Sequence, residues 1–145
     1  MEQTEAISAL GQYVGAMGLT ASAFYVGINI LMTMSLAFLV TNMRERTGIM
    51  TGDGGNEDLK KAIRAHGNNI EYVPLVLVAI ITMDMLGMAD VWVHAIGSAF
   101  VFSRALHAIG IYETLDRSPL RFVGAVGTYA VLLASGLIIL LQAYI

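Results

Sequence analysis

The sequence predicts an all-α membrane protein folded as a bundle of four transmembrane helices. Hydrophobic residues make up 57% of the 145 residues and charged residues only 13%, and the mean hydropathy is +0.70. A water-soluble domain of this length needs more charge to cover its surface. The apolar residues also gather in four runs, each long enough to span a hydrocarbon core, which takes about 20 helical residues. These runs lack the alternation that is typical of barrel strands.

The helices are expected within a single membrane domain that occupies residues 1–145. The expected helices lie at about 19–43, 57–88, 90–113 and 119–145. The lead, residues 1–18, is weakly polar and contains three glycines, so it is either a frayed extension or part of a long first helix. Near the middle of the first helix, Asn29 is expected to hydrogen-bond to another helix, as amides in membrane bundles often do.

A glycine-rich loop, residues 47–56, separates the first two helices. The run Gly52–Asn56 lacks the spacing and the Lys-Ser/Thr pair of a phosphate-binding loop, so it is interpreted as a turn. Asn56 is then the N-cap of the second helix, because its side chain can accept a bond from a free backbone N–H. Glu57 and Asp58 follow it in the first turn, where their negative charges interact favourably with the positive end of the helix dipole.

The second helix carries polar side chains from its first turns into its apolar run. Arg64, Asn68 and Glu71 are spaced i, i+4 and i+7, which places them on one stripe of a helix, and Tyr72 lies beside them. Polar groups carried into a membrane normally face a bundle interior, a cavity or each other. Pro74 has no N–H to donate, so a kink or a free carbonyl is expected one turn before it.

The last two helices differ in their polar content. The third holds Trp92 and His94 near its start, as suits a membrane interface, and Arg104 and His107 near its other end. The fourth carries small residues that favour close helix contact. These are Gly124, Gly127, Thr128 and Ala130.

The basic residues predict how the chain lies in the membrane. All eight fall at the end of the bundle that contains the first and third loops: Arg44, Arg46, Lys60, Lys61, Arg64, Arg104, Arg117 and Arg121. The opposite end holds acids instead, namely Glu2, Glu5, Asp84 and Asp90. The positive-inside rule therefore places both basic loops in the cytoplasm and both termini on the other side. The acidic N-terminus also lacks the basic start of a signal peptide.

Composition excludes several kinds of chemistry. The chain has no cysteine, so it offers no disulfide, thiolate metal site or cysteine nucleophile. Its three histidines are scattered without the spacing of metal ligands, and no metal is expected. The net charge of −3 gives no reason to expect nucleic acid as a partner.

The polar residues of the cytoplasmic end suggest a binding pocket. They are Arg64, Asn68, Glu71, Tyr72, Arg104, His107, Arg117 and Arg121, with Arg44 and Arg46 nearby. Such a set suits a small anion or zwitterion from water, with an apolar substrate arriving from lipid. A structural interpretation stays open beside it: Arg64 and Glu71 pair with each other or across subunits, and Asn68 bridges them, to fix the helix packing. Arg104 and His107 would then only snorkel or cap.

The motif Arg64-x-x-x-Asn68-x-x-Glu71-Tyr72-x-Pro74 resembles the second-helix signature of the MAPEG family, the membrane-associated proteins in eicosanoid and glutathione metabolism. The likeness covers nearly the whole chain. It includes four spans, a long first loop and the run Ser103-Arg104-x-x-His107, and it looks closest to the uncharacterised bacterial inner-membrane branch of the family.

The resemblance implies a homotrimer in which the second helix lines the central axis. It also implies that glutathione binds between neighbouring subunits near the cytoplasmic face. The implied contacts are Arg64, Asn68, Glu71 and Tyr72, with Arg104 and His107, with His66 from the neighbour, and with Arg44 or Arg46 at the end of the first helix. The arginine that activates the thiol is implied to be Arg121, or else Arg117.

The sequence also departs from the family. Where the eicosanoid enzymes carry two tyrosines four apart on the third helix, this chain has His107 and Ile111, and Tyr112 is one residue off register.

The expected function is a glutathione transferase or peroxidase that acts on lipophilic electrophiles in a bacterial inner membrane. One alternative is a noncatalytic lipid-binding or scaffold protein of the same fold. A small transporter or proton pathway is disfavoured, because the last two helices carry no acid at mid-span and no repeat symmetry is evident.

Overall fold

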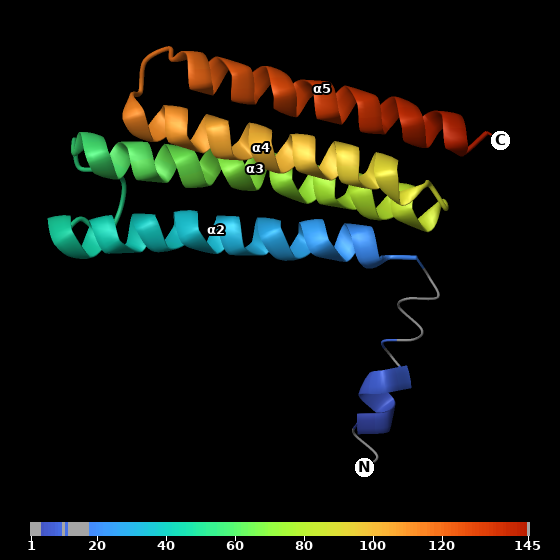
Figure 1. Cartoon of the computed structure of the whole chain (residues 1–145). Helices are drawn as coiled ribbons and strands as arrows, with labels where there is room; N and C mark the ends of the chain where they lie inside the picture. The colour runs from blue at the N-terminus through green and yellow to red at the C-terminus, as the bar shows by residue number, and fades with distance from the viewer. Residues whose placement is uncertain (1–3, 10, 12–17, 145) are drawn as a thin grey trace.

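The computed structural model describes residues 4–9, 11 and 18–144 of the chain. Its long helices are α2 (Thr20–Thr47), α3 (Glu57–Met85), α4 (Asp90–Glu113) and α5 (Pro119–Gln142). They lie side by side and alternate in direction, so the α2–α3 and α4–α5 loops lie at the same end of the bundle (Figure 1). All four are long and apolar enough to cross a membrane, which confirms the predicted all-α class with four apolar spans.

The helix ends differ from the expected bounds by a few residues. α2 continues to Thr47 because the residue that ends it is Gly48. Gly48 has a left-handed φ of 71° and donates its N–H to the Arg44 carbonyl at 2.8 Å. α3 ends at Met85, just before Gly87 with a φ of 74°. Residues 4–9 and 11 of the lead are helical, whereas the rest of residues 1–17 lies outside the described residues, as does residue 145.

Side chains cap both helices that begin at the basic end of the bundle. The Oδ1 atom of Asn56 accepts the N–H of Leu59 at 2.9 Å, and Glu57 and Asp58 occupy the first turn of α3, so the predicted N-cap is confirmed. Ser118 caps α5 in the same way, with Pro119 directly after it.

The interior of α3 accommodates its proline without ending the helix. α3 continues through Pro74 for more than two further turns, up to Met85. Because proline lacks an N–H, the carbonyl one turn earlier has no partner within the helix.

A buried carboxylate joins α2 to α3 at the end away from the basic loops. Asp84 is buried, and its Oδ2 accepts the backbone N–H of Ser22 at 2.8 Å, so it caps the N-terminus of α2. The expected interhelical bond of Asn29 is not made among the residues that the structure describes. Its Nδ2 donates to the Tyr25 carbonyl of its own helix, and its Oδ1 has no partner among the described residues.

The most extensive helix contact among the described residues is that between α4 and α5, and small residues permit it. A Cβ atom built on Gly124 would lie 2.6 Å from both the His107 nitrogen and the Ser103 carbonyl oxygen. α5 can therefore lie directly against the backbone of α4, as predicted from its small residues. This contact brings the middle of α5 next to Arg104.

Replacing Gly124 by alanine is expected to destabilise the fold by about 1–3 kcal/mol, because the backbones of α4 and α5 must separate to admit the methyl group. Denaturant unfolding in detergent micelles measures this change. Gly136→Ala is the matched control on the same helix, since a Cβ at Gly136 meets nothing within 4 Å. Equal effects of the two substitutions would contradict the packing argument.

Candidate functional site

The centre of the candidate site is the guanidinium of Arg104 on α4. This side chain is only 1% exposed and is the largest fully buried one in the described part of the chain. Its Nη2 donates to Asn68 Oδ1 at 2.8 Å, and its Nε donates to Asn69 Oδ1 at 3.4 Å. Its Nη1 reaches the hydroxyl of Thr128 on α5 at 3.5 Å. The partners of Arg104 are therefore neutral oxygens from the two neighbouring helices.

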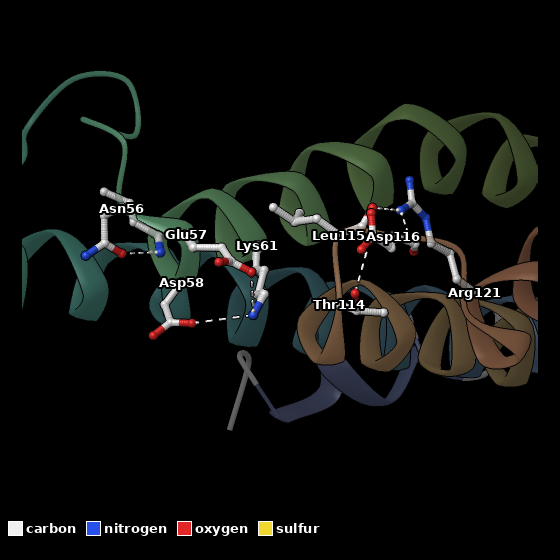
Figure 2. A network of polar contacts seen from close by, with 9 residues as sticks. Asn56, Glu57, Asp58, Lys61, Thr114, Leu115, Asp116 and Arg121 are labelled. Atoms are coloured by element: carbon white, nitrogen blue, oxygen red, sulfur yellow. Dashed lines mark hydrogen bonds and ion pairs between the residues drawn. The ribbon is translucent and has the colours of Figure 1, made fainter.

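Among the described residues, no carboxylate forms a hydrogen bond or an ion pair with Arg104. Within the described residues, ion pairs are made only by Lys61, with Glu57 at 3.3 Å and with Asp58 at 3.7 Å, in the first turns of α3 (Figure 2). Burying a cation without a counter-ion costs several kcal/mol, and ionisable groups inside membrane bundles usually mark a functional site. The charge of Arg104, which no ion pair among the described residues neutralises, is thus available to an anion.

The network around Arg104 extends to the remaining helix through Asn69. Asn69 is completely buried, and its Nδ2 donates to the hydroxyl of Thr33 on α2 at 2.9 Å. Sequence reasoning missed Asn69, Thr33 and the role of Thr128. The signal for Asn69 was present, since it shares the 3–4 residue spacing of the buried positions Ala65 and Val73.

Two tyrosines line the outer side of the Arg104 side chain. The cation lies 5.5 Å from the centre of the Tyr72 ring, within the range of a cation–π interaction. The hydroxyls of Tyr72 and of Tyr129 on α5 lie 3.4 Å apart, within hydrogen-bond range. Tyr129 was not predicted, and it supplies a phenol beside the position where His107 replaces a tyrosine of the eicosanoid enzymes.

A groove of about 830 Å³ opens beside this network at the basic end of the bundle. Its lining combines α3, α4, the α4–α5 loop and α5: Asn68, His107, Leu115, Asp116, Arg117, Ser118, Arg121, Phe122, Ala125 and Tyr129. A much smaller cavity of about 20 Å³ lies among the side chains at its inner end. The residues around it are Asn68, Tyr72, Arg104, His107, Ala125, Thr128 and Tyr129.

Arg121 and His107 are both tied to backbone near the mouth of the groove. The Nη1 of Arg121 donates to the carbonyls of Leu115 and Asp116 at 2.8 and 3.4 Å, which holds the α4–α5 loop against α5 (Figure 2). The Nδ1 of His107 lies 3.0 Å from the Arg121 carbonyl. Because a carbonyl only accepts, Nδ1 carries the proton, and a neutral His107 has an unprotonated Nε2.

Several predicted site residues lie away from the groove walls in a single chain. Arg64 lines a separate cleft of about 320 Å³ with Lys60 and Arg121. Glu71 is exposed and His66 is half-buried, and neither lines the groove as the described residues form it. Arg64 and Glu71 also make no ion pair within the described chain, so the pairing considered above is absent there.

The basic residues at the end of α2 also lie outside the groove. Arg44 donates through Nη1 to the carbonyls of Ile49 and Gly52 at 2.9 and 3.1 Å, so it holds the α2–α3 loop. Arg46 is exposed. The structure therefore brings together Asn68, Tyr72, Arg104 and His107, with Arg117 and Arg121 at the mouth of the groove.

Comparison with known proteins agrees with this architecture. The profile of the MAPEG family matches residues 22–141, which takes in nearly all of α2 to α5. Over 97 residues the chain is 37% identical to the inner membrane protein YecN of Escherichia coli (strain K12), and the alignment covers 66% of this chain and 73% of YecN. YecN of Escherichia coli O6:H1 matches to the same extent.

Asn69→Leu is expected to destabilise the protein by about 1–3 kcal/mol, because Arg104 Nε and the Thr33 hydroxyl both lose a buried partner. Thermal or denaturant unfolding in detergent gives the change. In an Arg104→Met background the same substitution should cost less, since one of the two orphaned groups is gone. Identical costs in the two backgrounds would show that Asn69 and Arg104 are energetically independent.

Proposed function

This chain belongs to the MAPEG family, and we propose that it binds glutathione as a co-substrate and acts as a transferase or peroxidase on lipophilic electrophiles. The observation that carries the proposal is the buried Arg104, which has neutral partners and lies at the inner end of an open groove. A cation kept in this state at a considerable energetic cost is explained by an anionic ligand.

The groove suits the size and the charges of glutathione. Its volume of about 830 Å³ falls in the usual range of small-molecule sites, about 300–1,000 Å³. Arg117 and Arg121 at its mouth suit the carboxylates of the tripeptide, Asp116 suits its ammonium, and the Asn68 amide suits a peptide group. When bound, glutathione supplies a thiol that reacts as the thiolate.

The predicted residues outside the groove fit an interface between subunits. Glu71 is exposed on α3, and Arg64 is exposed in the cleft that it shares with Arg121, where the neighbour in a homotrimer would cover both. We propose that they reach the ligand there, with His66 and with Arg44 or Arg46 contributed across the interface. Glu71 would then bind the ammonium of the ligand together with Asp116 or in its place.

The proposed setting is a bacterial inner membrane. Large apolar side chains such as Phe38, Leu75, Phe102 and Leu133 are exposed on the outside of the bundle, as suits contact with lipid or with a neighbouring subunit. The basic end is proposed to face the cytoplasm, with both termini on the other side. A lipophilic substrate would then enter the groove from the membrane, along Phe122 and Ala125.

One observation favours a second candidate function. Because the Arg104 network joins side chains of α2, α3, α4 and α5, it would also suit a noncatalytic lipid-binding or scaffold protein that uses the network only for stability. The two functions differ in what removal of the charge does. In a scaffold it weakens the fold or the oligomer, whereas in a glutathione protein it removes binding.

Isothermal titration of the protein in lipid nanodiscs should detect glutathione binding, and Arg104→Met should weaken it by about tenfold or more. This is the loss expected when a hydrogen bond from a buried cation, worth about 1.5–3 kcal/mol, disappears. Lys61→Met is the matched control, because its charge is already paired in the first turns of α3. Absence of binding to the unmodified protein would refute the proposed function, and unfolding or dissociation of Arg104→Met without any glutathione effect would favour the scaffold.

Arg64→Ala and Glu71→Gln are each expected to weaken glutathione binding by about threefold or more while leaving the monomer fold intact, since both side chains are exposed in a single chain. The same titration measures both variants, and chemical crosslinking reports the oligomer. If both variants bind glutathione with unchanged affinity, Arg64 and Glu71 are not part of the binding site.

A further inference from the structure

His107 on α4 presents an unused hydrogen-bond acceptor to the groove. Its Nδ1 donates to the Arg121 carbonyl at 3.0 Å, so the lone pair of the neutral ring lies on Nε2. Within the described part of the chain, Nε2 has no hydrogen-bond partner, yet the one buried side-chain atom without a partner there is Asn29 Oδ1. Nε2 is therefore not sealed inside the bundle, although His107 as a whole is only 7% exposed. It opens into the two spaces that His107 lines, the groove and the small cavity.

The place where the groove meets the small cavity contains one side chain that is suited to proton transfer. The residues that line both spaces are Asn68, His107, Ala125 and Tyr129. The Asn68 oxygen is already bonded to Arg104, and an amide has no proton to exchange. A phenol ionises near pH 10, whereas an imidazole is the side chain that ordinarily gains and loses a proton near neutral pH.

We propose that Nε2 of His107 takes the proton of the glutathione thiol and later returns it to the product, so that His107 is the general acid and base of the reaction. The inference rests on the proposed glutathione function and assigns a catalytic residue within it. A tyrosine at this position could donate its hydroxyl hydrogen, whereas a neutral His107 whose Nδ1–H is engaged can only accept at Nε2.

The charges around His107 permit this transfer because it creates an ion pair. The charged and titratable groups that line the same two spaces are Arg104 from α4, Tyr72 from α3, Tyr129 and Arg121 from α5, and Asp116 and Arg117 from the α4–α5 loop. Glu71 of α3 also acts electrostatically on Arg104. An imidazolium formed alone would add a cation beside these arginines. Proton transfer from a thiol forms an anion beside the imidazolium at the same time, so the net charge of the site stays the same.

The proton balance selects the class of electrophile. When Nε2 takes the proton, the S–H bond breaks, an N–H bond forms, and the electron pair of the sulfur then makes the S–C bond. Addition to an α,β-unsaturated carbonyl compound leaves an enolate, which takes the proton back from Nε2 and restores the neutral ring. Displacement of a halide leaves an anion that needs no proton. His107 therefore suits additions to long-chain α,β-unsaturated carbonyl compounds, which would enter from lipid along Phe122 and Ala125.

Nitrogen-15 NMR of the histidine-labelled protein in lipid nanodiscs tests the proton transfer directly. Without a ligand at pH 7, Nε2 of His107 should give the signal of an unprotonated imidazole nitrogen. Glutathione at saturation should convert the ring to imidazolium, whereas S-methylglutathione, which has no thiol proton, should leave it neutral. His107→Asn identifies the signal by removing it, and its amide can still donate to the Arg121 carbonyl.

His107→Asn should also slow the addition of glutathione to a long-chain enal at pH 7 by about tenfold or more. A thiol without a base, at its free pKa of about 8.5, is only a few per cent ionised at that pH. The rate of the variant should recover as the pH rises towards 8.5, so its pH profile lies above that of the unmodified protein on the pH axis. With an aryl halide as electrophile, no proton has to be returned, so the loss should be smaller.

His94→Asn is the matched control, because His94 is an exposed histidine near the other end of α4, where it contacts Tyr25. It should leave the rate and the pH profile unchanged. If glutathione binds while His107 stays neutral, or if His107→Asn keeps the rate and the pH profile of the unmodified protein, the inference is overturned and the proposed function stands. If the unmodified protein binds no glutathione, both are refuted.

Discussion

The burial of the Arg104 guanidinium is the constraint around which the bundle is arranged. A polar group buried inside the bundle is out of reach of water, so it needs a hydrogen-bond partner from the protein. Asn68 and Asn69 of α3 and Thr128 of α5 supply acceptors, and Thr33 of α2 accepts in turn from Asn69. All four helices are thereby held at defined distances from one side chain.

The chemistry of these partners explains why a site can exist there. A carboxylate in the place of Asn68 or Asn69 would neutralise Arg104 and leave a closed ion pair of purely structural value. Amides and hydroxyls orient the guanidinium without removing its charge. The same network that holds the helices together therefore keeps an electrostatic attraction for a ligand at the inner end of the groove.

The sequence allowed the helices, the cap at Asn56 and the clustering of basic residues at one end to be predicted, because these depend on local composition and spacing. It also identified a polar stripe on α3, but not which part of it turns inward. At about 100° per residue, Asn69 lies about 140° around the helix from Arg64, whereas Asn68 and Tyr72 lie about 40° and 80° from it. The buried face of α3 contains Asn69, so Asn68 and Tyr72 lie at its border and Arg64 on the far side. That rotation is set by packing against α2 and α4, and the local signal for it is the four-residue spacing of Ala65, Asn69 and Val73.

Tyr129 shows the same limit for contacts between distant segments. Its partner Tyr72 is 57 residues away in the chain, and the two meet because the small residues of α5 let that helix approach α4 closely. On α4 itself, His107 and Ile111 stand where the eicosanoid enzymes of the family have tyrosines, which taken alone argues against a phenol in the site. A cavity, however, is defined by the groups that reach it, whichever helix carries them. The phenol of Tyr129 on α5 reaches the small cavity beside Arg104. A phenol is therefore present in the site although α4 carries His107 and Ile111 in place of tyrosines.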